Sequence, residues 1–165
     1  SDGLRVLALQ SDSILAKRIT KSATAPKPPP SQAPLSPSAQ RGEQVYLACV
    51  ACHQPDGKGL PGAFPPLVGS RNLLGPVDLP TRIILKGLQG PLQAGGKYYN
   101  SMMPGHEGLL TDQQIADVLN YTRSAWGNKA EEVSARTVNS VRSEIAGRTS
   151  PWTAGELGLG HKSPK

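Results

Sequence analysis

Aromatic side chains, cysteines and long apolar runs are all scarce in this sequence. Only seven of its 165 residues are aromatic, although aromatic rings usually supply a large share of core contact area, so something else is expected to fill the core. Two cysteines exclude a multi-bridge secreted scaffold and leave one disulfide, a metal site, a redox pair or a cofactor attachment. No apolar run reaches the length of about 18 residues that a membrane-spanning helix needs, so none is predicted.

Glycine and proline, in contrast, are abundant, at 18 and 16 residues. Six prolines fall between residues 25 and 37 and favour an extended, semi-rigid linker. We therefore expect four segments: an N-terminal extension (1–24), a proline-rich linker (25–38), a main domain (39–128) and a partly helical C-terminal extension (129–165). The given sequence starts without Met or a leader. The apolar segment Leu4–Ile19 can form either a strand pair or a broken helix, and we expect it to be the tail of a neighbouring module.

Hydrophobic periodicity and capping signals predict helices over residues 40–50, 79–88, 112–126 and 135–146. Ser38 is expected to cap the first helix, and Thr111 with Gln114 forms a capping box at the third. Gly90-Pro91 is expected to end the second, and Ser150-Pro151 offers a further helix start. Strand patterns are almost absent, so an all-α fold with long irregular loops is predicted.

The most specific motif is Cys49-Val50-Ala51-Cys52-His53. Two thiols three residues apart can each add to one vinyl group of a haem, and the adjacent imidazole can reach the iron. Three alternatives remain at this point. A thioredoxin-type redox pair needs a strand–helix–strand context, a structural zinc site needs further ligands such as His106 and His161, and the motif can also occur by chance.

A haem iron in such a site needs a second axial ligand or an open position for chemistry. The two methionines of the chain, Met102 and Met103, are adjacent and precede Pro104. A thioether favours reduced iron and suits an electron carrier. Loop packing is the simpler interpretation of a methionine here, but beside the Cys-x-x-Cys-His motif the ligand role is favoured. His106, three residues further on, is an alternative ligand that we expect to be a surface residue instead.

These motifs together resemble a class I c-type cytochrome domain with a single haem. The resemblance covers about residues 39–128 and rests on Cys49–His53, Phe64–Leu67, Tyr99–Pro104, Leu119–Arg123 and Trp126–Asn128. It implies a cytochrome c fold, with three main helices and long loops around one haem c.

Residue by residue, the resemblance implies thioether bonds from Cys49 and Cys52 to the haem and His53 as proximal ligand. Met103 is implied as the distal ligand, with Met102 in reserve. Two further positions follow from the family: the Pro65 carbonyl accepts the other N–H of the proximal imidazole, and Leu67 lies against the ring. In this family the first and last helices cross closely, and the resemblance implies that Gly42, Tyr46 and Tyr121 lie at this crossing.

Four polar residues are candidates to hydrogen-bond the haem propionates, because partly buried carboxylates need donors: Arg71, Tyr98, Tyr99 and Asn100. Ordinary surface polarity is the alternative for each of them.

The charge of the chain lies mainly in its flanks. The total is +6, of which residues 1–37 contribute +3, residues 38–128 only +1 and residues 129–165 +2. No basic stripe with interleaved aromatics is present, so nucleic-acid binding is not expected. Basic flanks can steer association with an acidic redox partner.

The sequence thus predicts an electron carrier rather than an enzyme. The resemblance is nearest to cytochrome domains attached to or serving bacterial dehydrogenases, which implies an upstream dehydrogenase, a downstream cytochrome or oxidase, and a periplasmic or exported location. The alternative is a haem enzyme or small-ligand sensor with an open or labile distal site.

Overall fold

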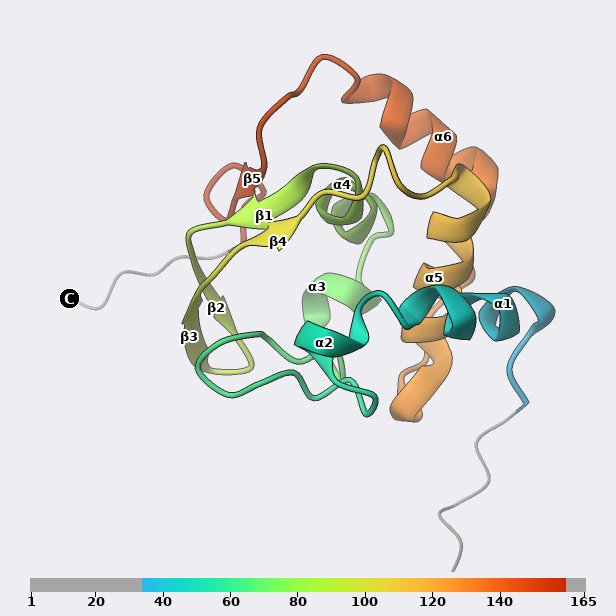
Figure 1. Cartoon of the computed structure of the whole chain (residues 1–165), viewed down its shortest axis with the longest axis horizontal. Helices are drawn as coiled ribbons and strands as arrows, with labels where there is room; N and C mark the ends of the chain where they lie inside the picture. The colour runs from blue at the N-terminus through green and yellow to red at the C-terminus, as the bar shows by residue number, and fades with distance from the viewer. Residues whose placement is uncertain (1–33, 160–165) are drawn as a thin grey trace, which may run out of the picture. The chain divides into compact units, whose positions relative to one another are not determined.

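The computed structural model describes residues 34–159 of the chain (Figure 1). The expected N-terminal extension, most of the linker and residues 160–165 lie outside the described residues. The helices in the described part are α1 (Pro37–Tyr46), α2 (Val50–His53), α3 (Arg71–Leu74), α4 (Asp78–Lys86), α5 (Asp112–Ser124), the 3-10 helix η1 (Ala125–Gly127) and α6 (Ala135–Glu144). None of these described helices is long and apolar enough to cross a bilayer.

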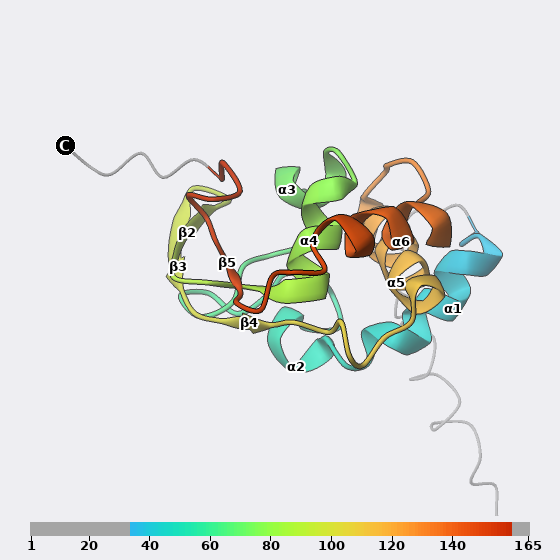
Figure 2. The ribbon, with the colours of Figure 1, turned by 90° about the horizontal axis from the view of Figure 1, so that it is seen from above.

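Two small sheets accompany the helices. Their strands are β1 (Gly87–Gln89), β2 (Pro91–Ala94), β3 (Lys97–Asn100), β4 (Met103–Pro104) and β5 (Trp152–Thr153). β1 lies between β4 and β5, antiparallel to the first and parallel to the second, and β2 pairs with β3 as a hairpin. The strands gather at one end of the described part, and α1, α5 and α6 at the other (Figures 1 and 2). The predicted all-α class is therefore not confirmed, because two small sheets accompany the helices of the described part.

The close crossing of α1 and α5 organises the helical end. A Cβ at Gly42 would collide with the Asp117 carbonyl oxygen, so only glycine lets the two backbones approach this closely. Beside this contact the rings of Tyr46, Tyr121 and Trp126 pack together, with centroid separations of 5.2 to 5.5 Å. Three of the seven aromatic residues are thus concentrated at one helix crossing.

The ends of α1 differ from the expected ones. Ser36, rather than Ser38, caps the helix, because Pro37 occupies the first turn, where a missing N–H costs nothing. Ser38 lies inside the helix and donates its hydroxyl proton to Asp117 instead. The helix ends at Tyr46, and the chain turns before resuming as α2, so the predicted single helix over residues 40–50 is wrong.

The third predicted helix begins as expected. Thr111 and Gln114 form the capping box of α5, which ends at Ser124 and continues into η1. Every residue from Ile115 to Arg123 is buried, because α1 and α6 flank the helix and a cleft adjoins it. Leu85, Val138, Val141 and Ile145 pack against α5 in the main hydrophobic cluster.

Two further helix predictions are wrong. α4 ends at Lys86, not at Leu88, because Gly87 turns the chain with a φ of 84° and Leu88 enters a strand. A Cβ at Gly87 would meet the Met103 carbonyl, which places β1 against β4. The predicted helix start at Ser150-Pro151 leads instead into strand β5, because Trp152 pairs with Leu88. The fourth predicted helix, α6, is present from Ala135 to Glu144.

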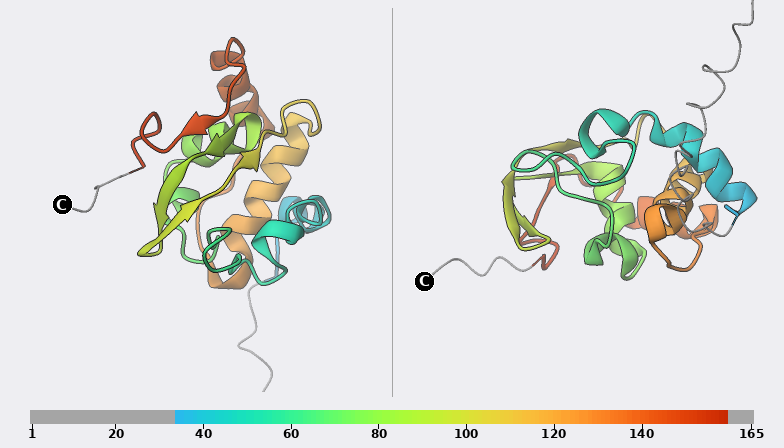
Figure 3. Two further views of the ribbon diagram at one scale, coloured as in Figure 1. Left: turned by 60° about the vertical axis from the view of Figure 1, so that its left-hand side comes forward. Right: turned by 90° about the horizontal axis from the view of Figure 1, so that it is seen from below.

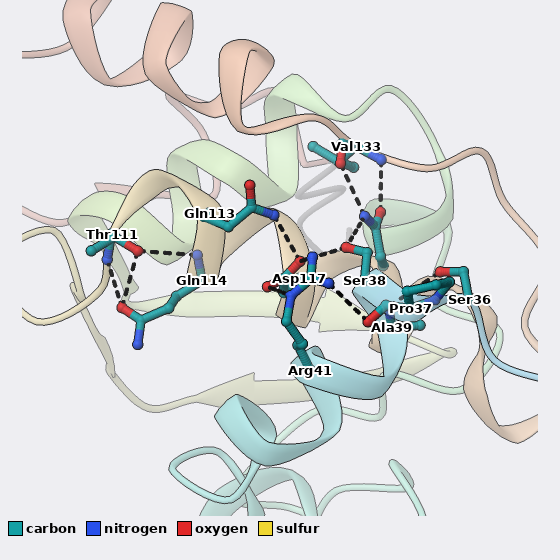
Figure 4. A network of polar contacts seen from close by, with 11 residues as sticks. Ser36, Pro37, Ser38, Ala39, Arg41, Thr111, Gln113, Gln114, Asp117 and Val133 are labelled. Atoms are coloured by element: carbon teal, nitrogen blue, oxygen red, sulfur yellow. Dashed lines mark hydrogen bonds and ion pairs between the residues drawn. The ribbon is translucent and has the colours of Figure 1, made fainter.

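A buried carboxylate ties three segments together (Figure 4). Asp117 accepts hydrogen bonds from Ser38, Gln113 and both Nε and Nη2 of Arg41, at 2.5 to 2.9 Å. Asn120 extends the network, donating to Ser38 and the Val133 carbonyl and accepting from the Val133 N–H. The network thereby joins α1, α5 and the segment before α6.

This environment sets the protonation of Asp117. Burial raises the pKa of the carboxyl, but the hydrogen bonds from Arg41, Ser38 and Gln113 outweigh it and hold the pKa below its usual value. Because the unfolded chain then binds the proton more tightly, protonation favours unfolding.

We expect Asp117→Asn to lower the free energy of unfolding at neutral pH by about 1–3 kcal/mol, because it loses charge-assisted hydrogen bonds. The stabilisation that the ionised Asp117 carboxylate provides should be complete above about pH 5. It should be lost as the pH falls below about 4, through the lowered pKa of this group. Urea unfolding followed by circular dichroism across this range measures it. Glu43→Gln, at an exposed position on α1, is the matched control, and an equal effect of both variants would contradict the prediction.

Candidate functional site

A cleft of about 200 Å³ opens between the helical end and the strands. Its walls come from α2, the loop at residues 64–67, α4, the β2–β3 hairpin and the methionine segment, and they are mainly apolar. Eight of the predicted site residues line it: Cys49, Cys52, His53, Pro65, Leu67, Tyr99, Met102 and Met103. Arg71, Tyr98 and Asn100 do not.

The Cys-x-x-Cys-His motif forms the single turn of α2. Cys49 is the N-cap residue, and its carbonyl oxygen accepts the N–H groups of Cys52 and His53. Residues three apart on a helix share a face, so both thiols face one side. The thiols are free, and burial, then the neighbouring Cys52, raises the pKa of Cys49.

The segment after the motif is held by Trp126 of η1, which continues the C-terminal end of α5. Its indole N–H donates to the Pro55 carbonyl at 3.0 Å, and Gly57 packs under its ring without room for a Cβ. Trp126 itself has a φ of 56°, unusual for a residue with a side chain, and these contacts hold it there. The end of α5 therefore fixes the loop that follows His53.

His53 is buried, and its orientation is fixed by Pro65. The ring Nδ1 lies 3.2 Å from the Pro65 carbonyl oxygen, and a carbonyl only accepts, so Nδ1 carries the proton and the Nε2 lone pair is free. Burial lowers the pKa of His53, and the hydrogen bond to Pro65 opposes this shift without cancelling it. The neutral imidazole that results is the form that binds a metal.

The Pro65 carbonyl is in turn positioned by Gly59, which has a φ of 67°. A Cβ at this position would meet the carbonyl oxygens of both Phe64 and Pro65. The Gly59 N–H also donates to the His53 carbonyl at 3.0 Å, so the loop closes directly beneath the histidine.

The two methionines differ in exposure. Met102 is 60% exposed, whereas Met103 is half-buried in β4, where it pairs with Leu88. Both line the cleft. The strand pairing gives Met103 a fixed backbone position that Met102 lacks.

The candidate propionate donors separate according to the pleat of β3. Successive side chains of a strand point to opposite faces, and Tyr99 is 5% exposed and lines the cleft, whereas Tyr98 and Asn100 are exposed. Arg71, at the first position of α3, is exposed as well.

His106 is not the surface residue expected from the sequence: it is half-buried and lines the cleft. Its backbone N–H donates to the Ile84 carbonyl at 2.8 Å, which draws the side chain to the cleft. The Nδ1 atom is buried and has no hydrogen-bond partner among the described residues. Ser101, which lines the cleft and donates to the Ala63 carbonyl, was also missed, since a loop serine carries no distinctive signal.

The chemistry of these residues fits a haem. The cleft is apolar and offers two free thiols for covalent attachment, together with a neutral imidazole and a half-buried thioether that can ligate iron. The buried Nδ1 of His106, which has no partner among the described residues, leaves one further polar contact to fill. Within residues 34–159 no three His, Cys, Asp or Glu side chains come together as a metal site, and His161 lies outside the described residues.

Comparison with known proteins identifies the family. Residues 39–126 match the Cytochrome c family. Cytochrome c-552 of Thermus thermophilus is 41% identical over 91 residues, which are 53% of this chain and 69% of that protein. The cytochrome c subunit of the alcohol dehydrogenase (quinone) of Gluconobacter oxydans (strain 621H) is 34% identical over 122 residues, 71% of this chain and 25% of the subunit.

A third relative is the gluconate 2-dehydrogenase cytochrome c subunit of Pantoea cypripedii, 37% identical over 110 residues, which are 64% of this chain and 25% of the subunit. The chain thus spans about a quarter of the length of these dehydrogenase subunits. With the cleft and its ligand groups, the family match supports the cytochrome c fold and an electron carrier rather than an enzyme. The chain belongs to the cytochrome c family and is an electron-transfer haem protein.

Proposed function

We propose that this protein carries single electrons from a dehydrogenase to a downstream cytochrome or oxidase through one haem c bound in the cleft. The observation that carries the proposal is that the His53 imidazole, on α2, and the Met103 thioether, on β4, line the same apolar cleft although 50 residues separate them in the sequence. When bound, the haem supplies an iron that changes oxidation state by one electron.

Each residue of the site has a distinct task in this proposal. Cys49 and Cys52 would hold the macrocycle through thioether bonds, and His53 and Met103 would supply the nitrogen and sulfur ligands of the iron. The hydrogen bond to Pro65 keeps His53 in one tautomer and one orientation. Leu67, in the cleft wall, excludes water. Tyr99, the buried member of the candidate donors, would donate a hydrogen bond to a propionate, whereas Arg71, Tyr98 and Asn100 are exposed at the surface.

The dehydrogenase partner is supported by the cytochrome subunits of alcohol and gluconate dehydrogenases among the relatives. A main domain over residues 39–128, joined to a neighbour by the proline-rich linker, fits such an assembly. The net charge of +1 on residues 38–128 leaves the cleft region almost neutral, and the basic flanks steer an acidic partner. A periplasmic or exported location accords with covalent haem attachment in the bacterial family.

Substituting the distal ligand tests the proposal. We expect Met103→Ala to abolish the far-red methionine–iron absorption band, let the reduced protein bind carbon monoxide, and weaken the preference for the reduced state by at least about tenfold, which is about 59 mV for one electron. Met102→Ala is the matched control and should change none of the three. The reverse pattern would assign the ligand to Met102. Carbon monoxide binding by the unsubstituted protein would favour a haem enzyme or ligand sensor instead.

Two glycine variants test the role of Pro65. Gly59 and Gly62 both have positive φ values, 67° and 78°, but a Cβ would collide with the Pro65 carbonyl only at Gly59. We expect Gly62→Ala to lower the free energy of unfolding by about 1–2 kcal/mol through backbone strain alone. Gly59→Ala should lower the free energy of unfolding by more than this. It should also shift the reduction potential, because the Pro65 carbonyl that accepts the hydrogen bond of His53 moves. Unfolding by urea and redox titration measure both effects, and equal potentials in the two variants would exclude the role.

A further inference from the structure

The chain beyond the family match, from residue 127 to 159, folds back over the main domain. α6 packs on α4 and α5 through Val138, Val141 and Ile145. Residues 148–159, which we call the strap, then run along the strand end of the structure and include β5 (Figure 3). The strap lines no part of the haem cleft, so its role is not explained by cofactor contact.

The strap reaches the methionine strand through one intervening strand. Leu88 of β1 pairs with Trp152 of the strap on one side and with Met103 on the other. β4 contains only two residues, and so short a strand is marginal without support from its neighbours. The position of Met103 therefore depends on β1, and β1 is held from its far side by β5.

The strap also supports the hairpin that leads into the methionines. Its Ala154 and Leu159 are buried in a cluster with Leu92 of β2. The partner strand, β3, ends at Asn100, directly before Ser101-Met102-Met103. Both structures that border the methionine segment, β1 and the β2–β3 hairpin, thus rest on the strap.

Trp152 anchors the strap. Its indole N–H donates to the Arg82 carbonyl of α4 at 3.2 Å, and the Arg148 guanidinium lies 3.7 Å from the ring centroid. Arg82 approaches the ring as well, at 5.7 Å. Arg148 donates in turn to the Ser150 and Pro151 carbonyls and to Glu156, which closes the strap on itself.

We propose that the strap is a positioning device for the distal ligand, and that Trp152 is its positioning residue. It keeps β1 in place so that the Met103 thioether stays on the iron and exchanges slowly with other ligands. The proposal rests on Met103 as the axial ligand. It predicts that weakening the strap raises the frequency of local opening at β4 far more than that of opening elsewhere.

The test is the rate at which imidazole binds to the oxidised, haem-loaded full chain, because imidazole enters only after methionine leaves. We expect Trp152→Ala to raise this rate by about tenfold or more when both proteins are compared at the same low imidazole concentration. The far-red methionine–iron absorption band should also be weaker in this variant. Trp152→Phe keeps a ring beside Arg148 but loses the N–H donor, and should show a smaller increase. Arg148→Gln, which leaves the tryptophan in place, is the second variant in case Trp152→Ala fails to fold.

Asp117→Asn is the stability control, because it weakens the helical end without touching the strap. An equal rise in the imidazole rate in that variant would overturn the proposal, since general destabilisation would then explain the effect. Unchanged rates in Trp152→Ala and Arg148→Gln would overturn it as well. Failure of the ligand assignment is distinguishable: the unsubstituted protein would then lack the methionine–iron band, whatever the strap variants do.

Discussion

The close approach of α1 and α5 at Gly42 determines where the Cys-x-x-Cys-His motif lies. Since α2 begins four residues after α1 ends, the position of α1 on α5 sets the position of Cys49, Cys52 and His53. Two kinds of contact secure the crossing: the aromatic cluster around Trp126 on one side and the Asp117 hydrogen bonds on the other. Because Trp126 of η1 also donates a hydrogen bond to the Pro55 carbonyl, the C-terminal end of α5 fixes the loop that follows the histidine.

The two sides of the cleft that carry His53 and Met103 are built differently. The His53 side is helical, and the imidazole is fixed by a hydrogen bond to a loop that glycine allows to close tightly. The Met103 side consists of short strands whose stability comes from neighbours distant in sequence, including β5. The imidazole is therefore fixed by contacts close to it in the chain, whereas the position of the thioether depends on long-range strand pairing.

The scarcity of aromatic residues is explained by their placement and by the cofactor. Three of them form the cluster at the helix crossing, and one of these, Tyr46, lines the cleft together with Phe64 and Tyr99. Aliphatic side chains and proline make up much of the remaining lining, which suits a flat apolar macrocycle. The abundant glycine has a matching role, since Gly59 and Gly87 permit backbone approaches beside the histidine and the methionine strand that no side chain would allow.

The sequence by itself determined the features that are encoded locally. The Cys-x-x-Cys-His spacing, the Met-Pro pair and the Thr111–Gln114 capping box are short-range patterns, and they identified the family, the haem and the start of α5. Only the tertiary structure decided the rest. Strands of two to four residues carry no periodicity, so β1, β4 and β5 could not be read from the sequence, nor could the break after Tyr46. The burial of Tyr99 but not Tyr98, the inward position of His106 and the link from Trp152 to Met103 all follow from pairings between residues far apart in the chain, which long-range packing alone specifies.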